Sequence, residues 1–364
     1  MDYLKWSKVH ERVRYELTGS GIPAASPDDF DTPLSPIGLE VRGTYGDPRL
    51  IEAIAARYAV PGAGILPVAG ASSGIFIAVS AVVEHGSIIL VEQPVYEPIR
   101  RVAAFRHLRV LPVARTPDRR FNVSVADIQA GLGRGARAVA LTNLHNPSGQ
   151  LLSPETMGHI AACCADAGAT LIVDEVYLDS SHLTCGGRRW TAAGVADNVI
   201  AINSLTKVYG LSGLRIGWIL SHAEIIERCR VVIDLLNVDN PAPSTSIALD
   251  AFRCIGRLER RFRQWYEPGQ QVFRRWLAQE PRLRGYPSCG AIFECVRLPE
   301  GVTSGALHQH LVSRYETQVV PGAFFGLDDH VRIGLVLPPA ELTEALARIS
   351  RALNDLSAAQ SRFT

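Results

Sequence analysis

The chain has 364 residues, 47% of them hydrophobic and 20% charged, which is enough for a large core or two packed domains and too much for one small module. The 37 basic and 36 acidic residues leave a formal net charge of +1, so no field of one sign favours nucleic acid or an anionic membrane as a partner. These values favour chemistry on small molecules.

The N-terminal segment, 1–44, opens with MDYLKWSKVHERVRYEL, which is charged and aromatic. It lacks the apolar core of a signal peptide, and the longest apolar run of the chain, IFIAVSAVV, is far shorter than the roughly 20 residues that a membrane helix needs. We therefore expect a cytoplasmic protein without a membrane span, and we expect segment 1–44 to pack on the C-terminal domain described below.

From about Tyr45 onward, short apolar runs alternate with helix-length segments. The runs are SIILVE, LRVLPV, ARAVALTN, ATLIVDE, NVIAINS and RIGWILS. Strands that are apolar throughout are typical of a sheet covered by helices on both faces. Between two of them, SPETMGHIAACCADAG begins with a Ser-Pro-Glu helix start and ends at Gly168. We predict an α/β domain over 45–281, with a mostly parallel central sheet sandwiched by helices.

The pattern changes after a long helical stretch from about Ser244 to Glu280. GAIFECVRL, a helix, ETQVVPG, HVRIGLVL and a last helix to about Leu356 then follow in α+β order. We predict a smaller α+β domain over 282–364. The seven cysteines are scattered without a CxxC pair, so we expect reduced thiols, no disulfide framework and no metal site.

Two motifs follow strands where open α/β sheets bind their ligands. In GASSGIFIAV, a small-residue turn opens an apolar helix, whose free N–H groups and the Ser72 hydroxyl suit a phosphate; a plain helix cap is the alternative. In LTNLHNPSGQ, Pro147 holds Asn146 extended, so that the amide can point into a cleft; a plain turn is the alternative.

Two further motifs carry the charged candidates. Asp174 in LIVDEVY ends a strand too apolar for an unpaired carboxylate, so a buried partner is expected, with a helix N-cap as the alternative. In SLTKVYGLSGLRIGW, Lys207 stands between hydroxyls and a glycine-rich loop, and Arg215 can reach the same anion as Ser204 unless it is a surface charge. A phosphate, a ring nitrogen that needs an acid, a ring oxygen bound by Asn146 and a carbonyl that reacts with Lys207 together describe pyridoxal 5′-phosphate (PLP).

These motifs resemble the class I/II aminotransferase superfamily of fold-type I PLP enzymes. The resemblance covers nearly the whole chain, in the order LTGSGIP, YGDPRL, GASSGI, PVYEP, NLHNPSG, VDEVY, SLTKVYGLSGLRIGW and HVRIGL. It implies the PLP-dependent transferase fold and makes Lys207 the Schiff-base lysine. It also implies that Asp174 pairs with the pyridinium nitrogen, that Asn146 and Tyr177 hold the ring oxygen, and that Tyr96 stacks on the ring.

The same resemblance implies residues for the phosphate and for the substrate. The phosphate ligands would be Ala71, Ser72, Ser204, Thr206 and Arg215. Arg332 in HVRIGL matches the arginine that clamps the substrate α-carboxylate, and Gly21 in GSGIP matches the turn that closes over the substrate, with Asn146 beside it. The planar guanidinium of Arg332 suits a carboxylate better than a lysine would.

Departures from the family pattern are informative. Many relatives have a tyrosine that reaches the partner's phosphate where this chain has Val41, so the role of Tyr45 is open. LLNVDNPAPSTS lacks the arginine of dicarboxylate-specific aspartate aminotransferases, which disfavours that activity. The resemblance also implies a homodimer, with the loop around Asn240 reaching the partner's site.

The first hypothesis for function is transamination between an amino acid and a 2-oxo acid. The second is elimination, decarboxylation or cyclisation at the same site, since YELTGSGIP, GLSGLRIGW and VVPGAFFGLDDHVRIGL are also similar to the capreomycidine synthase branch. A non-catalytic regulator is the third; it would need a fused DNA-binding domain or a lost lysine. Acidic residues at 234 and 239 suggest a cationic substrate, unless Asp239 is a turn former that faces solvent.

Overall fold

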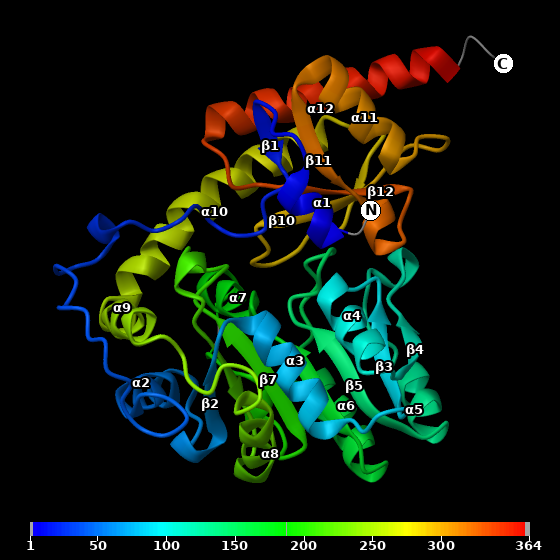
Figure 1. Ribbon diagram of the computed structural model, residues 1–364. Coiled ribbons are helices and arrows are strands. Elements are labelled where there is room, and N and C mark those ends of the chain that lie inside the picture. Colours follow the sequence, from blue (N-terminus) through cyan, green and yellow to red (C-terminus); the bar gives the residue numbers. More distant parts are fainter. Residues whose placement is uncertain (1–2, 187, 361–364) are drawn as a thin grey trace.

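The computed structural model describes residues 3–186 and 188–360, and it contains two β-sheets, one above the other in Figure 1. Within these residues the larger sheet has seven strands, in the order β2-β8-β7-β6-β5-β3-β4. All neighbours from β7 to β4 are parallel, whereas β8 is antiparallel to both β7 and β2. The strands are β2 (Ile65–Val68), β3 (Ile88–Gln93), β4 (Arg109–Ala114), β5 (Ala136–Thr142), β6 (Thr170–Asp174), β7 (Val199–Ser204) and β8 (Gly217–Leu220).

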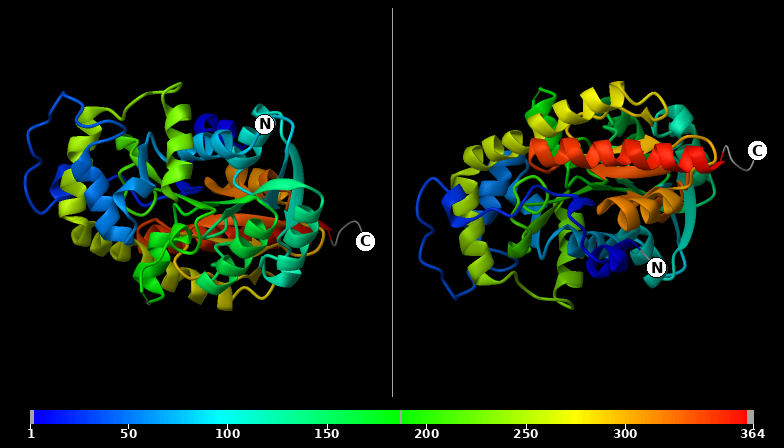
Figure 2. Two further views of the ribbon diagram at one scale, coloured as in Figure 1. Left: turned by 90° about the horizontal axis from the view of Figure 1, so that it is seen from below. Right: turned by 90° about the horizontal axis from the view of Figure 1, so that it is seen from above.

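Successive residues of the central strands point to opposite faces of this sheet, and both faces are buried. In β5, Val139 and Leu141 belong to one apolar cluster, whereas Ala138 and Ala140 belong to another. Helices cover both faces (Figure 2), which explains why these strands read as unbroken apolar runs. The helices are α2 (Pro48–Tyr58), α3 (Ala71–Val82), α4 (Glu97–Phe105), α5 (Val125–Gly133), α6 (Pro154–Asp166), α7 (Leu178–Thr184), α8 (Ala223–Ile233), α9 (Ala242–Arg253) and α10 (Ile255–Ala278).

The smaller sheet joins the two ends of the chain. Its strand order is β1-β11-β12-β10-β9, and β1 pairs in parallel with β11. The strands are β1 (Tyr15–Leu17), β9 (Arg284–Gly285), β10 (Phe293–Arg297), β11 (Thr317–Pro321) and β12 (His330–Gly334), and the helices are α1 (Tyr3–Val9), α11 (Ser304–Tyr315) and α12 (Pro339–Gln360). The pairing of β1 places the segment that follows it, from Thr18 onward, over the larger sheet.

The predicted fold class is confirmed: the chain is an α/β protein with a mostly parallel sheet, and all six predicted strands are present. Strand β2 was not predicted, since it is four residues long and contains Pro67. The single helical stretch expected from about Ser244 divides into α9 and α10, because the backbone of Cys254 leaves the helical conformation between them. No helix of the described residues is long and apolar enough to cross a membrane.

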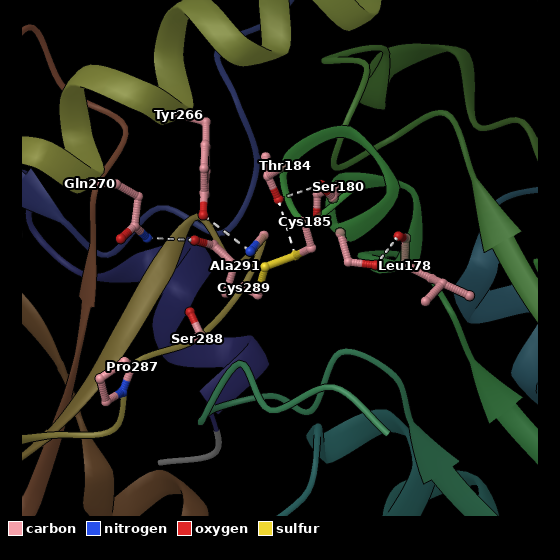
Figure 3. The surroundings of a disulfide bond; sticks show 12 residues. Leu178, Ser180, Thr184, Cys185, Tyr266, Gln270, Pro287, Ser288, Cys289 and Ala291 are labelled. Carbon is pink, nitrogen blue, oxygen red and sulfur yellow. Dashed lines mark hydrogen bonds between the residues drawn. A yellow bond between two sulfur atoms is a disulfide. The ribbon is translucent and has the colours of Figure 1, made fainter. Parts of the chain in front are cut away.

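The expectation that all cysteines are reduced is wrong for two of them. Cys185, directly after α7, and Cys289, just before β10, form a disulfide with their Cα atoms 6.0 Å apart (Figure 3). The other five cysteines are free thiols. The bonded pair is separated by 104 residues in the sequence, so no local spacing could indicate it; the fold brings the end of α7 and the segment before β10 together.

Candidate active site

A cavity of about 310 Å³ lies where β5 and β6 end, and α1 and the segment that follows β1 also line it. Among the side chains that line it are five expected from the sequence: Tyr96, Asn146, Asp174, Tyr177 and Lys207. They come from loops that follow β3, β5, β6 and β7, at the carboxyl ends of parallel strands, where such sheets bind ligands.

Lys207 follows β7 and projects into the cavity. Its Nζ donates a hydrogen bond to the Ser20 hydroxyl at 2.8 Å. Burial, and next the positive charge of Arg332, lower the pKa of this amine from 10.5 to about 8, although the Asp174 carboxylate opposes the shift. Near pH 8 about half of the Lys207 amine is therefore neutral and can act as a nucleophile or a base.

Asp174 ends β6 and is buried. Its Oδ1 accepts a hydrogen bond from the Val176 N–H at 3.1 Å, and no Lys, Arg or His of the described residues lies within ion-pair distance of it. Burial raises the pKa of Asp174 from 3.8 to about 7, against the opposing effects of the Val176 N–H and Lys207. A ligand that brings a positive N–H to this carboxylate would stabilise its charged form.

The N-terminus of α3 and Arg215 together form an anion cradle. Gly70 caps the helix with φ +84°, so no capping side chain takes the N–H groups of Ala71 and Ser72. The Arg215 guanidinium lies against Gly70, since a Cβ there would be 2.3 Å from its Nη2. Side chains larger than hydrogen at Gly70 would therefore close the cradle.

Ser204 is the last residue of β7, and Thr206 lies in the loop between β7 and Lys207. Ser204 is buried at the end of β7, and its Oγ accepts a hydrogen bond from the Thr206 N–H at 3.3 Å. This bond shapes the backbone just before Lys207, which is consistent with the hydroxyl-rich sequence around the lysine.

Asn146 and Tyr177 flank the cavity from neighbouring loops. The Oδ1 of Asn146 accepts a hydrogen bond from Arg332 at 3.0 Å, while the Tyr177 hydroxyl donates to the Ser20 carbonyl at 2.7 Å. Burial raises the pKa of Tyr177, and burial, followed by the nearby Asp174, raises the pKa of Tyr96 to about 12. Both phenols therefore keep their protons near neutral pH and can serve as hydrogen-bond donors.

Arg332 lies in the middle of β12 and is fully buried. Its guanidinium donates to the Tyr3 hydroxyl oxygen at 2.8 Å and to the Thr18 carbonyl at 3.3 Å, while its Nε has no partner. No carboxylate of the described residues pairs with it. A buried guanidinium without an anion is costly, and a ligand carboxylate would complete its interactions.

The N-terminal segment supplies the expected Gly21 and also residues that the sequence analysis missed. Gly21 lies beside Lys207, because a Cβ on Gly21 would be 3.6 Å from the lysine Cδ. Its neighbour Ser20 contacts the lysine amine, and Tyr3 and His10 also line the cavity. The sequence predicted Gly21 of the GSGIP motif but not its neighbour Ser20. No local sequence signal connects Tyr3 with Arg332.

Tyr45 lies apart from this cavity. Its backbone has φ 63°, and its hydroxyl donates to Asp234 at 2.9 Å while the Arg230 guanidinium stacks on its ring. Asp239 also lies elsewhere, in a second hollow of about 160 Å³ that is lined by residues of 35–49 and 239–253.

The donors in and beside the cavity fit PLP, although the expected phosphate ligands Ala71, Ser72, Ser204, Thr206 and Arg215 are not among the residues that line it. The Gly70–Ser72 turn with Arg215 offers an anion cradle, Asp174 is an acid without a cationic partner, and the Lys207 amine lies in the same cavity. A phosphate, a ring nitrogen and a reactive carbonyl match these three features in turn.

Residues 39–349 match the family described as aminotransferase class I and II. The chain is 28% identical to the arginine–pyruvate transaminase AruH of Pseudomonas aeruginosa, over 96% of this chain and 92% of the relative. It is 26% identical to the capreomycidine synthase of Streptomyces vinaceus, over 88% and 82% of the two chains.

Solved structures share the fold. A PLP-dependent aminotransferase from Streptococcus suis superimposes with a TM-score of 0.86 at 20% identity, covering 97% of this chain and 96% of the other. The PLP-dependent cyclase OrfR superimposes with a TM-score of 0.84 at 21% identity, covering 97% and 96%. Identities this low support the fold and not a substrate.

The lowered pKa of Lys207 can be tested in PLP-free protein with an amine-acylating reagent across pH. The chain has three lysines, and Lys5 and Lys8 are exposed on α1, so peptide mass spectrometry separates the buried amine from two internal controls. Because only the neutral amine reacts, we expect Lys207 labelling to rise with a midpoint near pH 8. A midpoint above pH 10 would contradict the environment described here.

Proposed function

We propose residue roles for this chain from the premise that it belongs to the class I and II aminotransferase family, whose match covers residues 39–349. The chain is a PLP-dependent aminotransferase, which exchanges an amino group between an amino acid and a 2-oxo acid. One observation supports these residue roles. The amine of Lys207, whose pKa is lowered, and the buried, unpaired carboxylate of Asp174 line the same cavity.

PLP, when bound, withdraws electrons from the Cα of the amino acid and so makes its Cα–H bond acidic. Asp174 would hold the ring nitrogen in its protonated form, which keeps the ring a strong electron acceptor. Asn146 and Tyr177 would bind the ring oxygen, and Tyr96 would stack on the ring. The phosphate would be held by Ala71, Ser72, Ser204, Thr206 and Arg215.

Lys207 would serve both as the covalent anchor and as the base. With a pKa of about 8, its Nζ is neutral in a useful fraction of molecules near neutral pH, so it can take a proton from the substrate Cα and return it. A lysine with an ordinary pKa would be almost fully protonated there and could do neither.

Arg332 would clamp the α-carboxylate of the substrate. Its buried guanidinium has no anionic partner, and the contacts with Asn146 Oδ1 and Tyr3 hold its plane in one orientation. Gly21 would close over the substrate from the N-terminal segment, since it already lies against Lys207.

For the substrate we propose an amino acid with a long, cationic side chain. Arg332 and Arg215 are assigned to the α-carboxylate and the phosphate. The described residues that line the cavity include no arginine, and no lysine other than Lys207, so a second carboxylate has no arginine or lysine left to pair with. The Glu16 carboxylate accepts a hydrogen bond from Thr18 and faces His10, and both of these residues line the cavity. The relative named as an arginine–pyruvate transaminase supports the same class of donor.

A second outcome at the same site is elimination or cyclisation, which the capreomycidine synthase relative and the cyclase OrfR support. The two outcomes differ in amino acceptor and product. Transamination needs a 2-oxo acid and yields another one, whereas elimination releases ammonia or water and a cyclase yields a ring without an acceptor. Product analysis with and without pyruvate separates them.

We further propose a homodimer. Seven of the nine exposed large hydrophobic residues in the described part of the chain fall in two short segments, 37–41 and 231–238, and Leu39 and Leu235 are 84% and 82% exposed. The second hollow adjoins both segments, and in it Asn240 is buried with neither amide atom bonded. A second copy would cover the apolar side chains and supply partners for Asn240.

Two smaller proposals complete this assignment. We divide the chain into an N-terminal segment, 1–44, a large domain, 45–281, and a small domain, 282–364, a division supported by the two separate sheets. We place the reaction in the cytoplasm, a proposal supported by the five free thiols of the described residues and opposed by the Cys185–Cys289 disulfide.

The anchor role of Lys207 is tested by Lys207→Ala, with Lys5→Ala as the matched control. We expect kcat/KM to fall by about 10²- to 10⁴-fold, because the base is lost. PLP should still bind without covalent attachment, since its other contacts remain. Borohydride reduction followed by mass measurement should trap PLP on wild type and Lys5→Ala only; PLP trapped on Lys207→Ala would exclude Lys207 as the anchor.

The substrate class is tested with a panel of donors at fixed concentration. We expect arginine and ornithine to exceed glutamate and phenylalanine in kcat/KM by on the order of tenfold, which corresponds to about 1.4 kcal/mol. Glu16→Gln should reduce the advantage of basic donors, whereas Asp239→Asn can do so only through the partner's site, because Asp239 lies outside the cavity of its own chain. Higher rates with glutamate than with every basic donor would reject the cationic class, and an unchanged ranking in Asp239→Asn would make Asp239 a turn residue.

The dimer is tested by light scattering behind size exclusion. We expect wild type and Phe105→Glu, a charge at an exposed apolar site of α4, to have twice the mass of the 39.5 kDa chain. Leu39→Glu combined with Leu235→Glu should give monomers, because two charges per subunit would be buried in the interface. A fully active wild-type monomer would refute the proposal.

A further inference from the structure

Ser20 contacts two of the residues that surround the reacting lysine. Its hydroxyl accepts a hydrogen bond from Lys207 Nζ at 2.8 Å, and its carbonyl accepts one from the Tyr177 hydroxyl at 2.7 Å. We propose that Ser20 is a positioning residue that holds the free Lys207 amine in place for proton transfer, whichever charge state the amine is in. This role rests on the proposed function of Lys207 as the reacting amine.

The backbone around Ser20 is fixed to the lysine loop itself. The Ile22 N–H donates to the Lys207 carbonyl at 3.1 Å, and the Ala25 N–H donates to the Gly210 carbonyl at 2.9 Å. Gly210 has φ +70°, and a Cβ there would lie 2.4 Å from the Pro23 carbonyl oxygen, so the two segments are in close contact. The position of Ser20 relative to Lys207 is therefore set by backbone contacts.

The other side of this segment is fixed to α10. Arg261 donates to the carbonyls of Pro23 and Ala24 at 3.0 and 2.9 Å and pairs with Asp29 at 3.1 Å. Together with the parallel pairing of β1 and β11, these contacts hold residues 18–25 at both ends. A hydroxyl on such a segment can direct an amine without moving itself.

A hydroxyl is the suitable partner for an amine that changes its charge. It accepts a hydrogen bond from either form of the amine and can donate one to the neutral form. A carboxylate would instead favour the protonated amine and remove the base near neutral pH. The charged groups that face Lys207 from the packed elements are Arg332 of β12, Asp174 of β6 and Arg215, and Ser20 adds no further charge to them.

Three substitutions at Ser20 separate positioning from a structural role: Ser20→Ala, Ser20→Thr and Ser20→Asp. Ser7→Ala is the matched control, because Ser7 also lines the cavity but its hydroxyl bonds only to the Leu4 carbonyl of its own helix. The first readout needs no PLP: it is the pH midpoint of Lys207 acylation in PLP-free protein. We expect Ser20→Ala and Ser20→Thr to keep the wild-type midpoint and Ser20→Asp to raise it by about one pH unit or more.

The second readout is the amine-transfer half-reaction with a Cα-deuterated donor. We expect Ser20→Ala to lower its rate by about 10- to 100-fold with KM little changed and with a larger isotope effect, because a misdirected amine slows the proton transfer itself. Ser20→Thr should restore most of the rate. Thermal unfolding and non-covalent PLP binding should match wild type in all four variants.

Wild-type rates and isotope effects in Ser20→Ala would overturn the proposal, as would an unchanged acylation midpoint in Ser20→Asp. If Ser20→Ala fails to fold, the Thr and Asp variants still test the proposal, through the pH midpoint of Lys207 acylation and the isotope effect of the half-reaction. Failure of the underlying function would appear differently, as PLP trapped on Lys207→Ala. If Lys207→Ala behaves as expected while the Ser20 variants resemble wild type, only the role of Ser20 is excluded.

Discussion

The rest of the structure depends on keeping three ionisable groups buried without pairing them. Lys207, Asp174 and Arg332 lie in or beside one cavity, and none of them forms a salt bridge with another within the described residues. Burial shifts the pKa of Lys207 and that of Asp174 toward each other, to about 8 and about 7. Such an arrangement costs folding free energy, which two large apolar clusters of the α/β sheet offset, and a ligand recovers part of it on binding.

A buried ionic cluster close to the lysine loop differs from the cavity because its charges are paired. Asp179 accepts hydrogen bonds from the hydroxyls of Tyr58 and Tyr209 and pairs with Arg189, while Arg57 donates to Tyr209. Every member has partners, and the pairing fixes the ring of Tyr209, two residues after the reacting amine. The charges of this cluster are thus paired among themselves, whereas Lys207, Asp174 and Arg332 have no ionic partner among the described residues and are left for ligands.

The sequence predicted those strands and site residues whose signals are local, and it did not predict contacts between residues that are distant in sequence. Unbroken apolar runs predicted the strands. Polar residues at the strand ends, such as Asn146 and Asp174, predicted one wall of the cavity, because parallel strands bring their carboxyl ends to one edge of the sheet. Ser20 and Tyr3 come from an N-terminal segment placed by the pairing of β1 with β11, about 300 residues away in sequence. The Cys185–Cys289 disulfide depends on a similarly distant contact.

These distant contacts also determine how the two sheets are joined around the cavity. On one side, residues 18–25 link the smaller sheet to the Lys207 loop through backbone hydrogen bonds. On the other, the disulfide links α7 to the segment before β10, where Gly290 packs so closely that a Cβ would lie 2.7 Å from the Ser181 nitrogen. With both sides tied, the spacing of Arg332 in the smaller sheet and Lys207 in the larger one is constrained by covalent and backbone contacts. α1, which reaches the cavity through Tyr3, is held by side-chain contacts, among them the hydrogen bond from the Leu4 N–H to the Glu97 carboxylate. The wall formed by α1 is therefore the part of the cavity that substitutions can alter with the least effect on the rest.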